Sequence, residues 1–349
     1  MSQRNPGLGY FNLARGLGMA LILLGHSMTP FAPAETAASG AGSVLGGGIM
    51  AMFFLISGMG FYSRSPKKCF SIQYRLLLKP YLLTTAAILL TKLVLALVKQ
   101  RPFAQHGGQL VLTYLLGLNA EGGGQLWGIP IESVSIFWFI LSLFGGWMLY
   151  NSICRLHNQN LQILLVTGCV VASYGLTLIS SVWIFCLPMV LLSVGYLAAG
   201  DMIRKFQLLD RKLPVWCWAV LLSISLICFC FGGVNQVGCN WKLGLLDVAG
   251  SFCVGFLLLR LYGRVMEKSP QGPLTRMTET VGFYSLWILF LHGYEKVIFP
   301  WYRLGEWMPQ GVAVVVCLAA RCAVMYGLFR LLNALNRNRR RKRRKTISF

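Results

Sequence analysis

The chain has few charged residues for its length. Only 12% of its 349 residues are charged, whereas 56% are hydrophobic and the mean hydropathy is +0.62. Soluble domains carry about a quarter charged residues. This shortage of charge excludes a soluble globular protein and predicts an all-α, multi-pass integral membrane protein.

Acidic residues are especially scarce, with ten Asp and Glu against 32 Lys and Arg, for a net charge of +22. Part of the basic excess forms one run, Arg339 to Lys345 (RRRKRRK). Because this run directly follows an apolar segment, it favours a cytoplasmic tail that fixes topology and contacts anionic headgroups. We therefore expect membrane lipids as partners of the tail, and no nucleic acid.

Several sequence motifs are missing as well. The chain has no G-x-S-x-G, no Walker-type glycine loop and no H-E-x-x-H, so no motif supports an elbow-type serine hydrolase, a P-loop ATPase or a zincin protease. None of the eleven cysteines belongs to a C-x-x-C pair with a matching second pair. We therefore expect neither a disulfide framework nor a metal site.

Long apolar segments dominate the rest of the chain. A spanning helix needs about 20 mostly apolar residues, and ten segments fit: Leu13 to Phe31, Val44 to Tyr62, Arg75 to Val98, Ser133 to Ile153, Leu161 to Ile179, Val182 to Ala199, Val215 to Gly232, Gly244 to Arg264, Val281 to Trp301 and Pro309 to Leu335. No small-residue cleavage site follows the first, which is therefore expected to be a retained helix.

Basic residues are concentrated in alternate joints between these segments, and the positive-inside rule then places both ends of the chain in the cytoplasm. Residues 1–335 are expected to form the transmembrane domain, and residues 336–349 the polybasic cytoplasmic tail. The longest outer connection, Lys99 to Glu132, contains QLVLTYLLGLN, which is too short to cross and predicts an interfacial or re-entrant piece.

Arg15 and His26 are the first ionisable residues inside a predicted span. At about 100° and 1.5 Å per residue they fall within roughly 20° of one face and about 16 Å apart along the axis. Such residues mark a function, a packing pair or a water-filled cavity. Two interpretations stay open: a topology charge with a helix-contact histidine, or a functional pair.

The ninth predicted span carries His292, at a depth similar to that of His26 if both helices run outward. Glu295 follows three residues later, where its carboxylate neighbours the imidazole and can hold its tautomer. This arrangement favours a catalytic or proton-handling role for the two histidines. Asp247 and Arg321, by contrast, are expected to form structural ion pairs.

His106 and His157 fall in joints and are expected to be solvated loop histidines.

Six segments, taken in order, resemble one family. ARGLGMALILLGHS resembles the opening of the acyltransferase 3 family, whose signature is an Arg separated by ten residues from a His. The further matches, with the family pattern in parentheses, are FFLISGMGF (FFFISGY), YRLLLKPYLL (R-L-x-x-P-Y), FWFILSLF (WFL-x-x-LF), LPMVLLSVGYLAAGDMIRK (L-x-x-LGYLLG) and GFYSLWILFLHGY (YSLxIYLLH). The WFL-x-x-LF form, without S-V-E-x-Q-F-Y, is closer to the sugar O-acetylase branch.

The resemblance implies a ten-helix membrane O-acyltransferase of a bacterial-type cell membrane. The family takes acetyl or another short acyl group from cytoplasmic acyl-CoA, and the acceptor is generally a hydroxyl of a cell-surface, cell-wall or lipid-linked carbohydrate. Arg15 and His26 match the essential pair, and Arg75 matches the basic residue before the third span. One departure is that four residues, LLLK, separate Arg75 from Pro80 instead of the more usual spacing.

The residue chemistry agrees with this implied activity. Coenzyme A is polyanionic, so its phosphates need cations at the inner face, where Arg15, Arg75 and Lys79 are expected. His26 is the expected general base, and His292, oriented by Glu295, is a second base or oxyanion donor.

Ser57, in FFLISGMGF, and Trp138, in FWFILSLF, are further candidate pocket residues, although Ser57 is equally compatible with simple helix packing.

Two other classes of function remain open. A proton-coupled transporter would use His26, His292 and Glu295 as a relay, but no internal repeat of the transporter type is visible. A membrane scaffold would use its tail to recruit lipid or a partner. Neither explains the ordered resemblance, and binding of CoA separates them from an acyltransferase.

Overall fold

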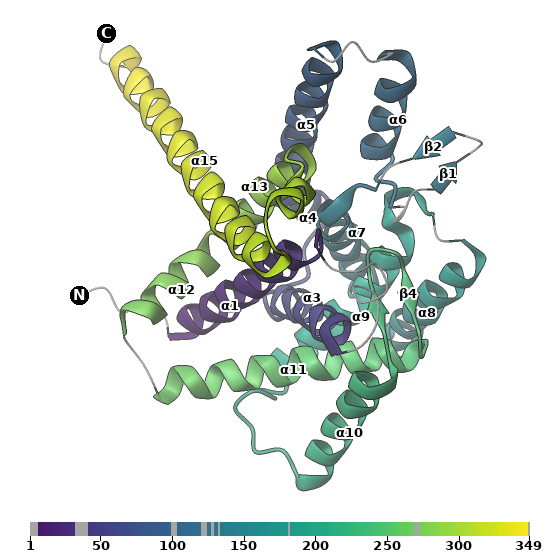
Figure 1. Ribbon diagram of the computed structural model, residues 1–349. Helices are drawn as coiled ribbons and strands as arrows, with labels where there is room; N and C mark the ends of the chain where they lie inside the picture. The colour runs from purple at the N-terminus through teal and green to yellow at the C-terminus, as the bar shows by residue number, and fades with distance from the viewer. Residues whose placement is uncertain are drawn as a thin grey trace.

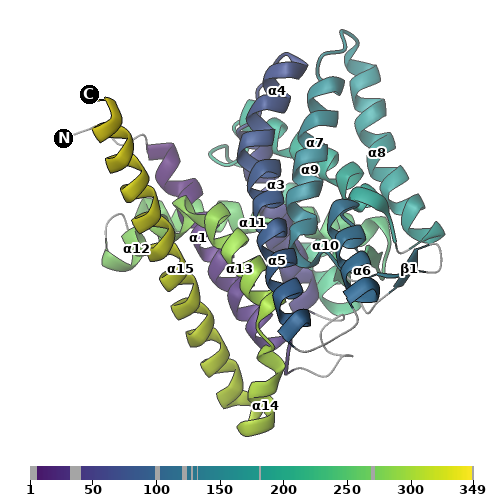
Figure 2. The same ribbon diagram turned by 90° about the horizontal axis from the view of Figure 1, so that it is seen from above.

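The computed structural model describes residues 6–31, 41–98, 103–119, 124–126, 129–131, 133–180, 182–268 and 272–347. The predicted all-α fold is confirmed: a bundle of helices carries two small antiparallel hairpins (Figure 1). Figure 2 shows the start of α1 and the end of α15 at one end of the bundle, with α14 at the other.

The helices have these bounds: α1 (Pro6–Met28), α3 (Ala41–Met59), α4 (Pro66–Gln73), α5 (Lys79–Val98), α6 (Phe103–Leu115), α7 (Trp138–Ile153), α8 (Gln159–Ile179), α9 (Leu187–Lys205), α10 (Val215–Phe231), α11 (Leu245–Lys268), α12 (Pro273–Phe283), α13 (Ser285–Ile298), α14 (Leu304–Trp307) and α15 (Gln310–Ile347). The hairpins are β1 (Gly124–Leu126) with β2 (Ile129–Ile131), and β3 (Val234–Asn235) with β4 (Asn240–Trp241).

Seven helical segments in the described part of the chain are long and apolar enough to cross a membrane. They contain α3, α4 with α5, α7, α8, α9, α11 and α15. The chain is therefore a multi-pass membrane protein. The count of ten spans and the cytoplasmic placement of both ends stay predictions, since α1 is not among the seven, α10 is a shorter apolar helix of 17 residues and α13 has 14 residues.

Several predicted boundaries are wrong. The third span does not begin at Arg75, because α4 continues through a π-helical turn, η1 (Tyr74–Leu78), into α5 as one segment of 33 residues. The ninth span is interrupted at Tyr284, which separates α12 from α13. The last helix does not end at Leu335, because α15 continues to Ile347 and includes the basic run. The side chains of that run lie outside the described residues.

The long predicted outer connection contains α6 and the β1–β2 hairpin, which agrees with a piece that does not span. Its ends, Lys99 and Glu132, lie outside the described residues.

Glycines bring the helices around α1 and α3 into close contact. A Cβ at Gly16 of α1 would collide with the Thr278 carbonyl of α12, and one at Gly282 would collide with the Asn12 carbonyl. Gly58 of α3 packs in the same way on Leu197 of α9. Small residues of this kind let membrane helices approach backbone to backbone. They fix α12, and with it the start of α13, against α1.

Candidate active site

His26 lies in the last turn of α1, where the helix ends before Pro30. Pro cannot continue a helical hydrogen-bond ladder, and the turn is closed by Thr29, whose hydroxyl donates to the His26 carbonyl at 3.1 Å. The neighbouring Ser27 hydroxyl donates back to the Leu23 carbonyl at 2.7 Å. His26 itself is half-buried, so it is the less buried of the two site histidines.

His292 of α13 meets His26 directly. His26 Nδ1 lies 2.7 Å from His292 Nε2, and the ring centroids are 5.0 Å apart with an interplanar angle of 21°. His292 is fully buried, in contrast to His26. The structure therefore brings together two histidines that lie 266 residues apart in sequence.

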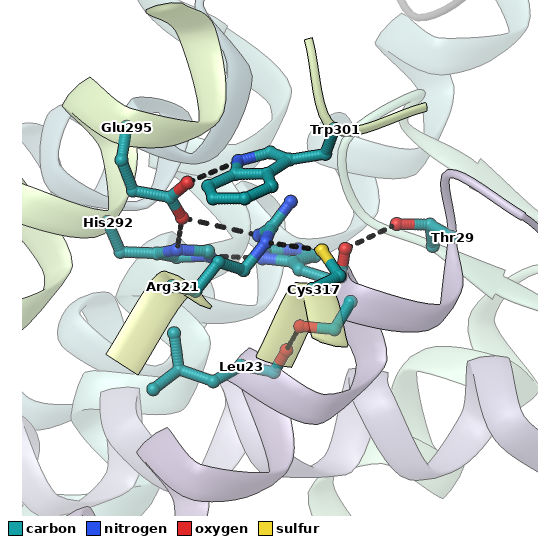
Figure 3. A network of polar contacts seen from close by, with 9 residues as sticks. Leu23, Thr29, His292, Glu295, Trp301, Cys317 and Arg321 are labelled. Carbon is teal, nitrogen blue, oxygen red and sulfur yellow. Dashed lines mark hydrogen bonds and ion pairs between the residues drawn. The ribbon is translucent and has the colours of Figure 1, made fainter. Parts of the chain in front are cut away.

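Glu295 extends this contact into a chain of hydrogen bonds. Its Oε1 lies 2.6 Å from His292 Nδ1, and its Oε2 accepts a hydrogen bond from Trp301 Nε1 at 2.5 Å (Figure 3). Glu295 is fully buried. A carboxylate bonded to one ring nitrogen of a histidine fixes its tautomer. Glu295 is therefore placed to fix the tautomer of His292.

Arg321 of α15 completes the cluster, and the sequence did not assign it there. Its Nη1 lies 3.3 Å from Glu295 Oε1, so the expected ion pair exists, but it belongs to the histidine site. The guanidinium also lies 5.2 Å from the Trp301 ring centroid, and Arg321 Nε bonds to Cys317 Sγ at 3.3 Å. The one signal available was a cation in the apolar stretch VVVCLAARCAVM, which requires a partner. No sequence signal pointed to Trp301.

Phe137 supports the cluster from the α7 side. The short helix η2 (Ser135–Phe137) brings this aromatic ring against Gly293, directly beside His292, where any Cβ would collide with it. The same ring stacks at 6.3 Å on Phe290 and packs edge-on against Tyr81 at 5.9 Å. Glycine at 293 is therefore required for α13 to sit this close to α7.

Arg15 lies on α1, about 16 Å from His26 along the helix axis. It is half-buried, and within the described residues no hydrogen bond or ion pair engages its guanidinium. A half-buried cation without a protein partner is suited to an anionic ligand.

Arg75 lies within the π-helical turn and Lys79 follows it directly, and both side chains are exposed. The Lys79 N–H bonds to the Tyr74 carbonyl five residues earlier, so the turn contains one residue more than an α-helical turn. This provides the physical account of the LLLK spacing: the extra residue before Pro80 is absorbed in the helix. Such π-bulges are frequent at functional sites.

Trp138 and Ser57 are the other two candidate pocket residues. Trp138 is buried against Phe54 and Phe139, at ring distances of 6.4 and 6.1 Å. Ser57 is half-buried on α3. Within the described residues neither forms a hydrogen bond or ring contact with the histidine cluster.

Asp247 corrects another expectation, because it forms no ion pair with any residue that the structure describes. It is fully buried and accepts hydrogen bonds from the backbone N–H groups of Leu243 at 2.7 Å and Gly233 at 3.3 Å. His157 is exposed in the joint after α7, as expected. His106 lies within α6 instead of a loop, and its side chain is outside the described residues. No group of three His, Cys, Asp or Glu in the described residues is arranged to hold a metal ion.

A chain of two imidazoles and a carboxylate, ending in a half-accessible histidine, can accept a proton at one end and stabilise the resulting charge along its length. The comparison with known families gives this chemistry a context. A family model described as an acyltransferase domain, acyltransferase 3, matches residues 8–345, nearly the whole chain. The chain belongs to the acyltransferase 3 family. No curated protein and no solved structure gives a significant match.

Membership in an acyltransferase family indicates which chemical tasks the histidine cluster would have to perform. Acyl transfer in general needs a group that removes a proton from the acceptor and a means of stabilising the charge that results. Within the described residues, the histidine cluster has ionisable groups suited to both tasks, and it joins α1 to α13 and α15, which lie at the other end of the sequence.

Proposed function

We propose that this acyltransferase moves an acyl group, acetyl in the first instance, from acyl-CoA to a hydroxyl of a cell-surface, cell-wall or lipid-linked carbohydrate. The observation that carries the proposal is the hydrogen-bonded chain His26–His292–Glu295, with His26 the accessible end. The setting we propose is the cytoplasmic membrane of a bacterial-type cell.

The acyl donor, acyl-CoA, is proposed to bind at the cations on α1 and on the α4–α5 segment. The guanidinium of Arg15, which has no hydrogen bond or ion pair within the described residues, suits a phosphate of CoA, and Arg75 and Lys79 are exposed cations of the α4–α5 segment. The rise of about 16 Å between Arg15 and His26 leaves room for the extended pantetheine arm. The thioester is then delivered towards the histidines.

The chemical step is a direct transfer. His26 accepts the proton of the acceptor hydroxyl as its oxygen attacks the thioester carbonyl carbon. The carbon–sulfur bond breaks, the ester forms, and the departing CoA thiolate takes the proton back from His26. His292 and Glu295 stabilise the transient positive charge. Trapping of labelled acetyl on the protein without acceptor would instead favour an acyl-histidine intermediate.

A second candidate function is proton-coupled transport, favoured by the same buried chain of ionisable groups. It gives no specific role to Arg15 and predicts no response to CoA.

The first experiment compares purified protein with the variants Arg15→Ala and His26→Ala. Parent protein should be thermally stabilised by CoA and should consume acetyl-CoA. Arg15→Ala should bind CoA about 10- to 100-fold more weakly, the cost of losing a charge-assisted contact. His26→Ala should keep CoA binding but lose about 10²- to 10⁴-fold in kcat.

The controls are Arg303→Ala and His157→Ala, which remove an exposed arginine and an exposed histidine outside the site. Both should behave as the parent protein does. A folded parent that neither binds CoA nor consumes acetyl-CoA contradicts the proposal, and a proton-coupled transport assay then tests the alternative.

A further inference from the structure

We infer that Arg321 and Trp301 hold Glu295 as a carboxylate, and that this makes Nε2 of His26 the nitrogen that accepts the proton. The inference rests on the proposed acyl transfer and adds to it two positioning residues. It also assigns which ring nitrogen of each histidine bears hydrogen.

The surroundings of Glu295 supply the first step. Two hydrogen-bond partners and one cation converge on its two oxygens: His292 Nδ1 lies at Oε1 and Trp301 Nε1 donates to Oε2, while Arg321 Nη1 lies 3.3 Å from Oε1 as an ion-pair contact. Glu295 is fully buried and Arg321 is 1% exposed, so water supports neither charge. A buried carboxylate needs a paired cation and hydrogen-bond donors, and this cluster provides both.

Trp301 binds both members of the ion pair. Its indole N–H edge donates to Glu295, while Arg321 lies 5.2 Å from the ring centroid, within the range of a cation–π contact. Arg321 Nε is held in turn by Cys317 one helical turn earlier. The guanidinium therefore has three separate contacts that fix it, as Figure 3 shows from close by.

The positions of the protons follow from the ionised carboxylate. A carboxylate only accepts hydrogen bonds, so His292 Nδ1 must carry hydrogen. A neutral His292 then has Nε2 free to accept, and His26 Nδ1 must donate to it. Nε2 of His26 is left with its lone pair, and no hydrogen bond in the described residues engages it.

Among the charged groups that act on His26 and His292, Glu295 supplies the negative charge. Lys296 and Arg321 act on both histidines as cations, whereas Glu295 acts on His292 as an anion. When His26 takes a proton from the acceptor, the new positive charge arises in a cationic surrounding. Glu295 is the anion placed to balance it, through His292.

The test compares Arg321→Met, Glu295→Gln and the variant that combines them with the parent protein, with Arg321→Lys as the conservative change. Each single variant should lose about 10²-fold or more in kcat, while KM for acetyl-CoA changes by less than about threefold, because Arg15 and the donor end are untouched. Arg321→Lys, which keeps the charge, should recover part of the lost kcat.

The double variant shows whether a loss of kcat comes from lost positioning of Glu295 or from lost stability of the protein. Arg321→Met leaves a buried carboxylate unpaired and should lower the melting temperature, whereas adding Glu295→Gln removes that charge and should restore it. With Trp301 donating to the single amide oxygen, the amide NH₂ faces His292 and reverses the chain, so that Nε2 of His26 carries hydrogen. The double variant should therefore be stable and still slow.

Arg330→Gln, which changes an exposed arginine of α15 bonded to Tyr326, is the matched control and should leave kcat unchanged. The inference is overturned if Arg321→Met keeps its kcat, or if the double variant recovers turnover together with stability. If the parent itself transfers no acyl group, the proposed function fails instead, and the two failures are thus distinguishable.

Discussion

His26 and His292 differ in exposure, and this difference divides their proposed roles. Half-buried His26 is the histidine proposed to meet the substrate, whereas the ring of fully buried His292 forms hydrogen bonds with His26 and Glu295 in the described part of the chain. A buried imidazole that accepts a hydrogen bond from the reacting ring and donates one to a carboxylate stabilises positive charge on the reacting ring, while the carboxylate itself stays ionised. A histidine without such a partner would form its imidazolium without this stabilisation.

Gly293 permits the position of His292, and its substitution is the first prediction at this scale. Gly293→Ala places a Cβ where the Phe137 ring lies and should shift α13 away from α7. We expect a loss of about 1–3 kcal/mol in stability, together with a lower kcat because His292 moves relative to His26.

The matched control for Gly293→Ala is Gly168→Ala in the middle of α8, where an added Cβ meets no atom within 4 Å. Alanine should stabilise this helix by about 0.5–1 kcal/mol. Thermal unfolding and turnover of the two variants, measured side by side, check the prediction. Equal behaviour of the two would contradict it.

Among the helices, α1 and α12 have the closest backbone contact that bears on the site. Gly16→Ala and Gly282→Ala each introduce a methyl group against a carbonyl of the other helix. We expect each to destabilise the protein by about 1–3 kcal/mol. Because α1 carries both Arg15 and His26, CoA binding and turnover should fall together.

This prediction is checked by CoA-dependent thermal shift and by acetyl-CoA consumption, with Gly311→Ala in α15 as a control whose Cβ meets open space. A Gly282→Ala protein with unchanged stability and turnover would show that the contact between α1 and α12 is not required.

The π-helical turn accommodates one extra residue without rotating the helix that follows it. The family pattern R-L-x-x-P-Y has one residue fewer than the stretch from Arg75 to Tyr81. In a regular helix an extra residue rotates everything after it by about 100°. Because the turn absorbs the residue, Tyr81 remains on the buried face and contacts Phe137.

For the whole molecule, the basic run at the end of α15 is separate from the histidine site. Replacing residues 339–345 by Gln should weaken orientation or lipid contact, because about 1 kcal/mol of attraction to anionic lipid is lost per basic residue. Turnover per correctly inserted molecule should stay at the parent value.

The measurement is cysteine-accessibility mapping of orientation, combined with activity in vesicles with and without anionic lipid. A correctly inserted variant that has lost turnover would contradict the separation of tail and site.

The sequence by itself determined the class of the protein and half of the site. Low charge and long apolar segments require a membrane bundle whatever the packing, because lipid solvates no backbone or charge. Helical periodicity alone relates Arg15 to His26, and Glu295 to His292, since each pair shares one helix. The ordered motifs indicated the family that the match to residues 8–345 establishes.

Only the tertiary structure decided how the two halves of the site meet. The contact between His26 and His292, and the pairing of Glu295 with Arg321, join α1, α13 and α15, and no local pattern encodes the distance between helices. The sequence could not indicate Trp301 for the same reason, since its hydrogen bond to Glu295 depends on how the chain turns back after α13. Residue types and periodicity fix which groups a helix presents, whereas packing fixes which groups they meet.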